Sequence, residues 1–315
     1  MRCSIVIRSF NEEKYIGRLL EGILQQTEKD IEIILVDSGS TDATVAIASH
    51  YPVRICHINP SEFTFGRSLN YGISKAKGDY VINASAHIFP LYTDWIYLLL
   101  LHFNDAQVGL VYGKQRGNST TRFSEKQLLK HWYPDSSQFR QTHPFCNNAN
   151  AAIKRSLWEQ HPYDELLPGL EDIDWARWAI EQGYYISYAH EAEIIHVHDE
   201  APRRVFNRYR REAIAFKKIF PHEQFNLTNF IKLYLTNAES DIRYASSQHV
   251  LSENIIEILW FRFMQFWGTY QGYRYSGPLT EKLRQTFYYP LIDKPTSNQY
   301  SRDAKLIRYD DVLKD

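Results

Sequence analysis

Residues 79–90 read Asp-Tyr-Val-Ile-Asn-Ala-Ser-Ala-His-Ile-Phe-Pro, and the remainder of the 315-residue chain is interpreted outward from this segment. Its aromatic and β-branched residues at 80–82 follow a Lys-Gly-Asp turn, which predicts a buried strand that ends near Ser85, with the chain breaking at Pro90. The functional crevice of an open α/β sheet lies at the carboxyl ends of its strands. Ser85 and His87 are therefore expected to face a ligand.

Strand-like and helix-like patterns alternate on the amino-terminal side of this segment. Apolar residues recur at helical spacing between residues 16 and 24, whereas residues 31–36 form the near-continuous aliphatic run that is typical of a central parallel strand. The alternation continues to about residue 113 and indicates an α/β protein with a mostly parallel, doubly wound sheet. The expected strands are residues 4–10, 31–36, 53–58, 80–85 and 108–113, and the expected helices are residues 16–24, a segment capped by Thr41 or Asp42, and residues 67–76.

The carboxyl-terminal half carries one acidic and one basic helical pattern. Residues 167–180 predict a helix with an acidic first turn, and residues 201–220 predict a basic amphipathic helix. The change in composition near residue 200 indicates a catalytic domain at 1–200 and a helical region at 201–315. Further expectations are loops and one helix at 114–142, a pair of strands at 184–198, helices at 227–235 and 250–270, and an irregular tail after Pro290.

The composition narrows the class of protein and its compartment. A formal charge of -1 and a pI near 6.9 give no global case for a nucleic-acid partner. Three widely separated cysteines fit neither a disulfide framework nor a cysteine-based zinc site, and no secretory leader pattern follows Met1, so a cytoplasmic location is expected. Residues 255–270 are interrupted by Glu257 and Arg262 and fall short of the roughly 20 apolar residues that a membrane span needs.

Four segments follow one another in the amino-terminal half: Ser-Ile-Val-Ile-Arg-Ser-Phe-Asn-Glu-Glu at 4–13, Val-Asp-Ser-Gly-Ser-Thr-Asp at 36–42, Arg-Ser-Leu-Asn-Tyr-Gly-Ile at 67–73 and Lys-Gly-Asp-Tyr at 77–80. Each segment alone is a weak signal, because the second, for example, is also a good turn and helix cap. Their order resembles family 2 glycosyltransferases, which have the nucleotide-sugar-binding GT-A fold. The resemblance implies this fold, a nucleotide-sugar donor and an inverting transfer of the sugar.

In the resembling family an Asp-x-Asp motif at a strand end holds the sugar nucleotide and its divalent metal. Ser85, Ala86 and His87 stand in that place here, so the resemblance implies that Ser85 and His87 bind the donor and that His87 is a ligand of Mn²⁺ or Mg²⁺. His196 and His198 lie two residues apart on one strand face and are candidates for a further ligand, with His196 favoured. The alternative is a structural role for these histidines.

Other residues near strand ends are also implied in donor binding. Asp37 resembles the family position that accepts a hydrogen bond from the nucleobase, and Ser9, Phe10 and Glu12 line the end of the first strand beside it. Arg67 is expected at the start of a helix, where its guanidinium and the backbone N–H groups would neutralise the diphosphate. A surface salt bridge is the alternative role for Arg67.

Catalysis requires a carboxylate within hydrogen-bond reach of the acceptor hydroxyl, because that hydroxyl must lose its proton as it attacks. A Glu-Asp pair supplies the base in the resembling family. This implies Asp172 as the base and Glu171 as an acceptor contact or a contact at the helix start, and the sequence leaves the reverse assignment open. The alternative explanation for acidic residues at 171, 172 and 174 is the helix dipole.

These features favour a glycosyltransferase that acts on a glycan or polyprenyl-linked acceptor in bacterial surface polysaccharide biosynthesis. The alternative is a non-catalytic protein of the same fold that binds a nucleotide sugar or a glycan, because the Asp-x-Asp motif is missing. A nucleotidyltransferase and a Rossmann dehydrogenase are disfavoured, because neither a Gly-rich basic phosphate loop nor a G-x-G-x-x-G motif follows the first strand.

The basic helix expected at 201–220 carries seven Lys and Arg residues. Its apolar residues, which include Val205, Tyr209 and Ile214, suit a peripheral contact with an anionic membrane surface. Packing of that apolar side on the catalytic domain, or on a second subunit of a homo-oligomer, is the alternative.

Overall fold

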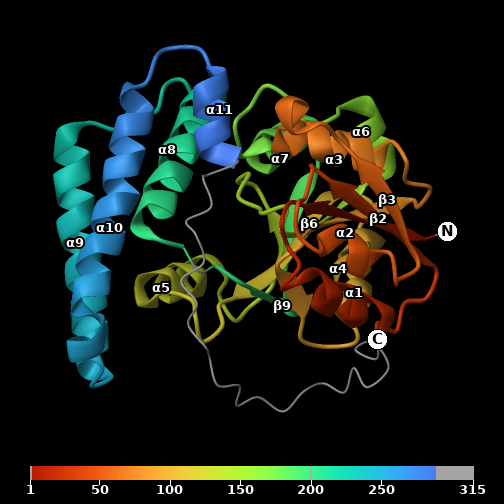
Figure 1. Cartoon of the computed structure of the whole chain (residues 1–315), viewed down its shortest axis with the longest axis horizontal. Coiled ribbons are helices and arrows are strands. Elements are labelled where there is room, and N and C mark those ends of the chain that lie inside the picture. The colour runs from red at the N-terminus through yellow and green to blue at the C-terminus, as the bar shows by residue number, and fades with distance from the viewer. Residues whose placement is uncertain (1, 199, 289–315) are drawn as a thin grey trace.

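The computed structural model describes residues 2–198 and 200–288, and these residues form a central sheet flanked by helices (Figure 1). The strands of this part of the chain lie in the order β3-β2-β1-β4-β8-β6-β9-β5, and β7 pairs with β9. Their bounds are Cys3–Ser9 for β1, Ile31–Asp37 for β2, Val53–His57 for β3, Tyr80–Ser85 for β4, Ile88–Pro90 for β5, Val108–Arg116 for β6, Gln138–Gln141 for β7, Asn150–Lys154 for β8 and Tyr185–His196 for β9.

The predicted α/β class with a mostly parallel sheet is confirmed. Strands β1, β2, β3 and β4 are parallel to one another, and β8 runs antiparallel to both β4 and β6. Strand β9 is parallel to β6, whereas β5 and β7 run antiparallel to β9. Within residues 2–198 and 200–288, six strands therefore run in one direction, and β5, β7 and β8 run in the other.

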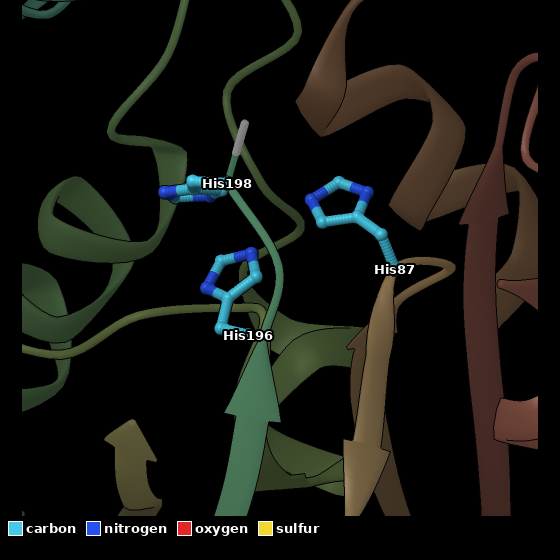
Figure 2. Close-up of side chains that lie close together, drawn as sticks. All are labelled: His87, His196 and His198. Carbon is cyan, nitrogen blue, oxygen red and sulfur yellow. The ribbon is translucent and has the colours of Figure 1, made fainter. Parts of the chain in front are cut away.

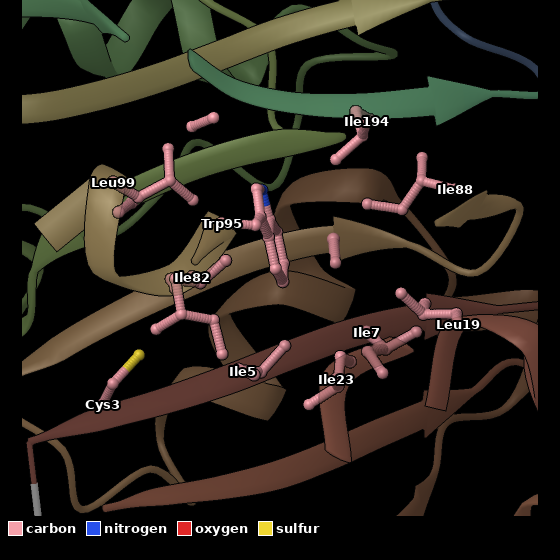
Figure 3. Close-up of a cluster of buried hydrophobic side chains, with 14 of the residues drawn as sticks. Cys3, Ile5, Ile7, Leu19, Ile23, Ile82, Ile88, Trp95, Leu99 and Ile194 are labelled. Carbon is pink, nitrogen blue, oxygen red and sulfur yellow. The ribbon is translucent and has the colours of Figure 1, made fainter. Parts of the chain in front are cut away.

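Helices cover both faces of the sheet because strand residues alternate between the two sides. On β1, Ile5 and Ile7 pack in one apolar cluster with Trp95, while Val6 packs in a second cluster with Trp175 (Figure 3 shows the first cluster). Burial of each such side chain contributes about 1.5–3 kcal/mol to folding. The helices around the sheet are α1 at Ile16–Leu24, α2 at Thr44–Ala48, α3 at Phe65–Ile73, α4 at Trp95–Leu101, α5 at Phe123–Trp132, α6 at Arg155–Gln160 and α7 at Glu171–Glu181.

A bundle of long helices follows the sheet and stands beside it (Figure 1). Helices α8 (Pro202–Ile219) and α10 (Leu251–Arg274) approach closely, because Gly268 and Gly272 carry no side chain where α8 passes. A Cβ atom at either glycine would lie 2.5 Å from a backbone oxygen of α8. Helix α9 is Leu227–Ser247 and the short α11 is Glu281–Tyr288.

Several element boundaries differ from the sequence predictions. Helix α2 begins at Thr44 and its N-cap residue is Ala43, whereas the sequence predicted a cap at Thr41 or Asp42. The Asp42 carboxylate still accepts a hydrogen bond from the Thr44 backbone N–H. The expected strand pair at 184–198 is the single strand β9, since its two ends pair with different partners, β7 and β5. The segment at 114–142 holds α5 as expected, but also the end of β6 and all of β7. Helix α9 extends well past residue 235, α11 was not predicted, and the tail expected after Pro290 lies outside the described residues.

The basic helix α8 packs its apolar side inside the protein. Val205, Tyr209 and Ile214 are buried, and the first two form a small core with Phe261 of α10. These side chains therefore pack inside the protein, as the alternative expected. They are not exposed, so they do not offer the apolar face that the membrane contact would require. Among residues 2–198 and 200–288, no helix has the length and apolarity required to cross a membrane.

Candidate active site

Two adjoining cavities, of about 260 and about 300 Å³, lie where strands of the sheet end beside α8. Both cavities are lined by Arg8, Ser85 and Arg208. Nine of the residues predicted from the sequence line one cavity or the other, although they come from distant segments of the chain. Ser9, Phe10 and Glu12 line the first cavity, His87, Glu171, Asp172, His196 and His198 line the second, and Ser85 lines both.

Asp37 does not line either cavity and holds the turn beneath the first one. Its carboxylate is buried and accepts the backbone N–H groups of Gly39 at 3.1 Å and of Ser40 at 3.2 Å. Gly39 has φ of 90°, a left-handed conformation that glycine adopts without strain. The neighbouring Ser38 does line the first cavity. The structure therefore shows a role for Asp37 in shaping the site, and nucleobase recognition by Asp37 stays a prediction.

The prediction for Arg67 is not supported by its position. Helix α3 begins at Phe65, and Arg67 lines neither cavity and pairs with Glu165 at 2.8 Å. Its guanidinium also donates to the backbone oxygen of Glu62. The structure thus contains the surface salt bridge that was the alternative role for Arg67, with a partner 98 residues away in the chain, and diphosphate binding by Arg67 stays a prediction.

Four other arginines line the two cavities. Arg8 and Arg211 lie over the Phe65 ring, each with its guanidinium carbon 4.7 Å from the ring centroid. Arg204 lines the first cavity, and Arg208 lines both. On α8, positions 204, 208 and 211 lie on one helical face. This spacing is visible in the sequence, but the membrane interpretation took these basic residues as contacts for anionic lipid.

Three histidines converge beside these arginines (Figure 2). One ring nitrogen from each of His87, His196 and His198 lies within 4.8 Å of the others. The ring centroids of His196 and His198 are 4.0 Å apart, and those of His87 and His196 are 5.0 Å apart. The structure thus brings together the three residues that the sequence analysis put forward as metal ligands.

Each of these histidines is held through its Nδ1 atom. Nδ1 lies 2.7 Å from an oxygen of Glu12 in His87, of Gln115 in His196 and of Glu125 in His198. This leaves the Nε2 atoms for another partner, and within the described residues the buried Nε2 of His196 has no hydrogen-bond partner. Such oxygen acceptors behind imidazoles are typical of metal sites, so the residues fit a divalent cation.

The pKa values of His87 and His196 are shifted in opposite directions, although burial acts to lower both. Burial and the neighbouring His198 and His87 rings hold the pKa of His196 well below its usual range. Burial also acts to lower the pKa of His87, but the Glu12 carboxylate outweighs it and raises that pKa. Burial acts to raise the pKa of Glu125, yet the Arg208 guanidinium and the hydrogen bonds with His198 and Arg208 outweigh it and lower that pKa to about 2. Glu125 is therefore an anion beneath the histidines.

The two predicted catalytic carboxylates begin helix α7 and are buried. Asp172 accepts the backbone N–H of Asn148 at 2.9 Å, and Glu171 lies 3.5 Å from the Arg8 guanidinium. Burial and then the charge of Glu171 raise the pKa of Asp172 to about 7. Leu170, which precedes them, has φ of 57°, a strained conformation for a residue with a side chain. A carboxyl group with this pKa can gain and lose a proton near neutrality.

A comparison with known protein families places the chain. Residues 4–161 match the family described as "Glycosyl transferase family 2". The chain belongs to glycosyl transferase family 2. This match covers β1 to α6 and includes all four segments that carried the resemblance, so the predicted family and the predicted class of enzyme are confirmed.

Relatives of this family 2 glycosyltransferase include two proteins named as O-antigen chain rhamnosyltransferases. The O-antigen chain rhamnosyltransferase RfbN of Salmonella typhimurium is 28% identical over 224 residues, which are 66% of this chain and 70% of that protein. The O-antigen chain rhamnosyltransferase WbaN of Salmonella anatum is 31% identical over 199 residues, which are 59% of this chain and 62% of that protein.

Solved structures share the fold at low sequence identity. The mannosyltransferase PcManGT from Pyrobaculum calidifontis in complex with GDP-Man and Mn²⁺ has a TM-score of 0.57 at 18% identity, and covers 93% of this chain and 88% of its own. Staphylococcus aureus TarS 1-349 in complex with UDP has a TM-score of 0.55 at 14% identity, and covers 91% of each chain. The GT-A fold predicted for this family 2 member is thereby confirmed.

Proposed function

We propose that this protein is an inverting glycosyltransferase that moves a sugar from a nucleoside diphosphate donor to a hydroxyl of a glycan or polyprenyl-linked acceptor of a bacterial surface polysaccharide. One observation carries the proposal: the Asp172 carboxyl, the arginines and the three histidines meet in two adjoining cavities. The names of the two Salmonella relatives support rhamnose as the transferred sugar and an O-antigen-like chain as the acceptor.

The first cavity suits the nucleotide end of the donor. The rings of Phe63, Phe65 and Tyr288 meet edge to face there at 5.1–5.4 Å, and Phe10 lines the same cavity. Aromatic walls of this kind can hold a nucleobase by stacking. The diphosphate would then lie toward Arg8, Arg204, Arg208 and Arg211, whose guanidinium groups match phosphate oxygens.

The histidine cluster would hold the divalent cation of this family. His87, His196 and His198 would coordinate it through nitrogens that are left free by their Nδ1 partners. When bound, such a cation stabilises the negative charge that develops on the departing diphosphate. Arg208 and Arg211 of α8, which line the second cavity together with the histidines, would share that task.

Asp172 would act as the base. Its carboxylate removes the proton of the acceptor hydroxyl while the hydroxyl oxygen attacks the anomeric carbon, and the bond from that carbon to the diphosphate breaks. A single displacement of this kind inverts the configuration of the anomeric centre. Glu171, held by Arg8 and by the Asn148 amide at 3.3 Å, would position the site without taking the proton.

The test is transfer by the purified chain from a panel of nucleoside diphosphate sugars that includes rhamnose donors, followed by NMR assignment of the product anomer. We expect product from one donor with inverted configuration, and none with the D172N variant. A product that retains the donor configuration would overturn the mechanism. Donor binding without turnover under every condition would favour the non-catalytic alternative.

A further inference from the structure

We infer that the three-histidine cluster is built for a late first-row divalent cation, of the Co²⁺ or Zn²⁺ kind, and discriminates against Mg²⁺. This inference rests on the proposed function, which places a divalent cation beside the donor. It goes further by naming the class of cation, which the sequence left open between Mn²⁺ and Mg²⁺.

The donor atoms offered to the cation are imidazole nitrogens. His87 comes from the turn between β4 and β5, while His196 ends β9 and His198 follows it, so two separate segments hold the rings in place. His196 is 6% exposed and its Nε2 has no hydrogen-bond partner in the described part of the chain. A buried nitrogen without a partner is costly, and a bound cation would satisfy it.

Three carboxylates next to the cluster already have a histidine or arginine partner. Glu12 is bonded to His87, Glu125 to His198 and Arg208, and Glu200 lies 2.8 Å from Arg208. Ser85 stands where the resembling family would offer a further carboxylate. These carboxylates therefore bond histidine or arginine, whereas the ligand atoms that lie within 4.8 Å of one another belong to the three histidine rings.

Divalent cations differ in the ligand atoms that they prefer, so this set of ligands favours some of them over others. Mg²⁺ binds oxygen ligands in octahedral geometry and keeps several waters, so three imidazoles are a poor set for it. Imidazole suits Zn²⁺ and other late first-row ions, and affinity rises from Mn²⁺ through Co²⁺ in the usual order. Three imidazole ligands would leave further coordination positions of the ion for diphosphate oxygens.

Direct binding to the metal-free chain, without donor or acceptor, tests the inference. We expect one Co²⁺ per chain, seen by isothermal titration calorimetry and by the visible d–d absorption of Co²⁺, and Mg²⁺ binding that is more than about a hundredfold weaker. H87Q and H198Q should each weaken Co²⁺ binding by about tenfold or more. These two side chains are 28% and 20% exposed, so both variants should fold, which circular dichroism will check.

The matched control is H190Q. His190 lies on β9, the strand that ends at His196, and its side chain is 31% exposed. It bonds Ser137 outside the cluster, so its replacement should leave Co²⁺ binding unchanged. Displacement of Co²⁺ by Mg²⁺ at similar concentrations would overturn the inference, as would binding that survives in the H87Q/H198Q double variant. Because binding is measured without substrates, it can fail while transfer persists, or hold while transfer is absent.

Discussion

The Oδ2 atom of Asp172 accepts a hydrogen bond from the backbone N–H of Asn148 at 2.9 Å. This bond joins the start of α7 to the segment before β8, and a second one, from the Ile173 N–H to Oδ1 at 2.8 Å, fixes the plane of the carboxylate. The carboxylate therefore keeps one orientation toward the second cavity, which a base acting on a bound hydroxyl needs.

Replacement of Asp172 by Asn should lower turnover by about 10²–10⁴-fold, because an amide keeps the shape of the side chain but cannot accept the proton. Donor affinity should change little. Initial rates and calorimetric donor binding measure the two effects. D174N is the control, since Asp174 lies in the first turn of the same helix but pairs with Arg177 and lines neither cavity. A D172N enzyme with near-normal turnover would remove Asp172 from the mechanism.

The rate should rise with pH through neutrality, because Asp172 acts as a carboxylate and its pKa is raised to about 7. Turnover at saturating substrates, measured from about pH 5 to about pH 9, should show an acid limb near that value. A limb near pH 4, the ordinary range of a carboxyl group, would contradict the assignment.

The same raised pKa predicts a change in stability. A carboxyl group whose pKa is higher in the folded than in the unfolded state contributes stability that is full below the unfolded value of about 3.9 and is lost as the pH rises through the folded value. For Asp172 the loss falls between about pH 4 and about pH 7. Thermal unfolding over this range should show a steeper decline for the wild-type protein than for D172N, and equal slopes would refute the prediction.

Arg211 should contribute to donor affinity through the phosphates. The R211M variant keeps the aliphatic stem near Phe65 but loses the guanidinium, so the affinity for a nucleoside diphosphate should fall by about tenfold or more, the worth of one or two charge-assisted hydrogen bonds. Binding of the nucleoside alone should not change. R203M, at an exposed position of α8 outside both cavities, and R67M should bind like the wild type. Equal losses in all three variants would point to a general charge effect.

The helical bundle should depend on one buried ion pair. Arg262 of α10 donates two hydrogen bonds to Asp241 of α9, at 2.7 and 2.9 Å, and both side chains are 3% exposed. D241A should destabilise the protein by about 3–5 kcal/mol, because it leaves a buried charge unpaired. E239A, which removes the partner of exposed Arg243, should cost no more than about 0.5 kcal/mol. Urea unfolding of both variants compares the two costs, and similar midpoints would contradict this role for the pair.

The sequence by itself determined the elements of the amino-terminal half and the edge at which the site lies. Apolar periodicity is a local property, so β1, α1, β2 and α3 fall within a few residues of their predicted bounds. Parallel strands bring their carboxyl ends to one edge, which is why Ser9, Ser85 and His87 could be assigned to a site before their distances were known.

Only the tertiary structure decided which charged groups face that edge. Arg67 and Arg211 are both basic residues on helices, yet one pairs with Glu165 at the surface and the other turns into the cavities. The raised pKa of Asp172 and the His196 Nε2 atom, which has no hydrogen-bond partner among the described residues, likewise depend on burial by distant segments. Local pattern specifies which face of a helix is apolar, but the neighbour of a polar side chain is set by packing between elements that are far apart in the chain.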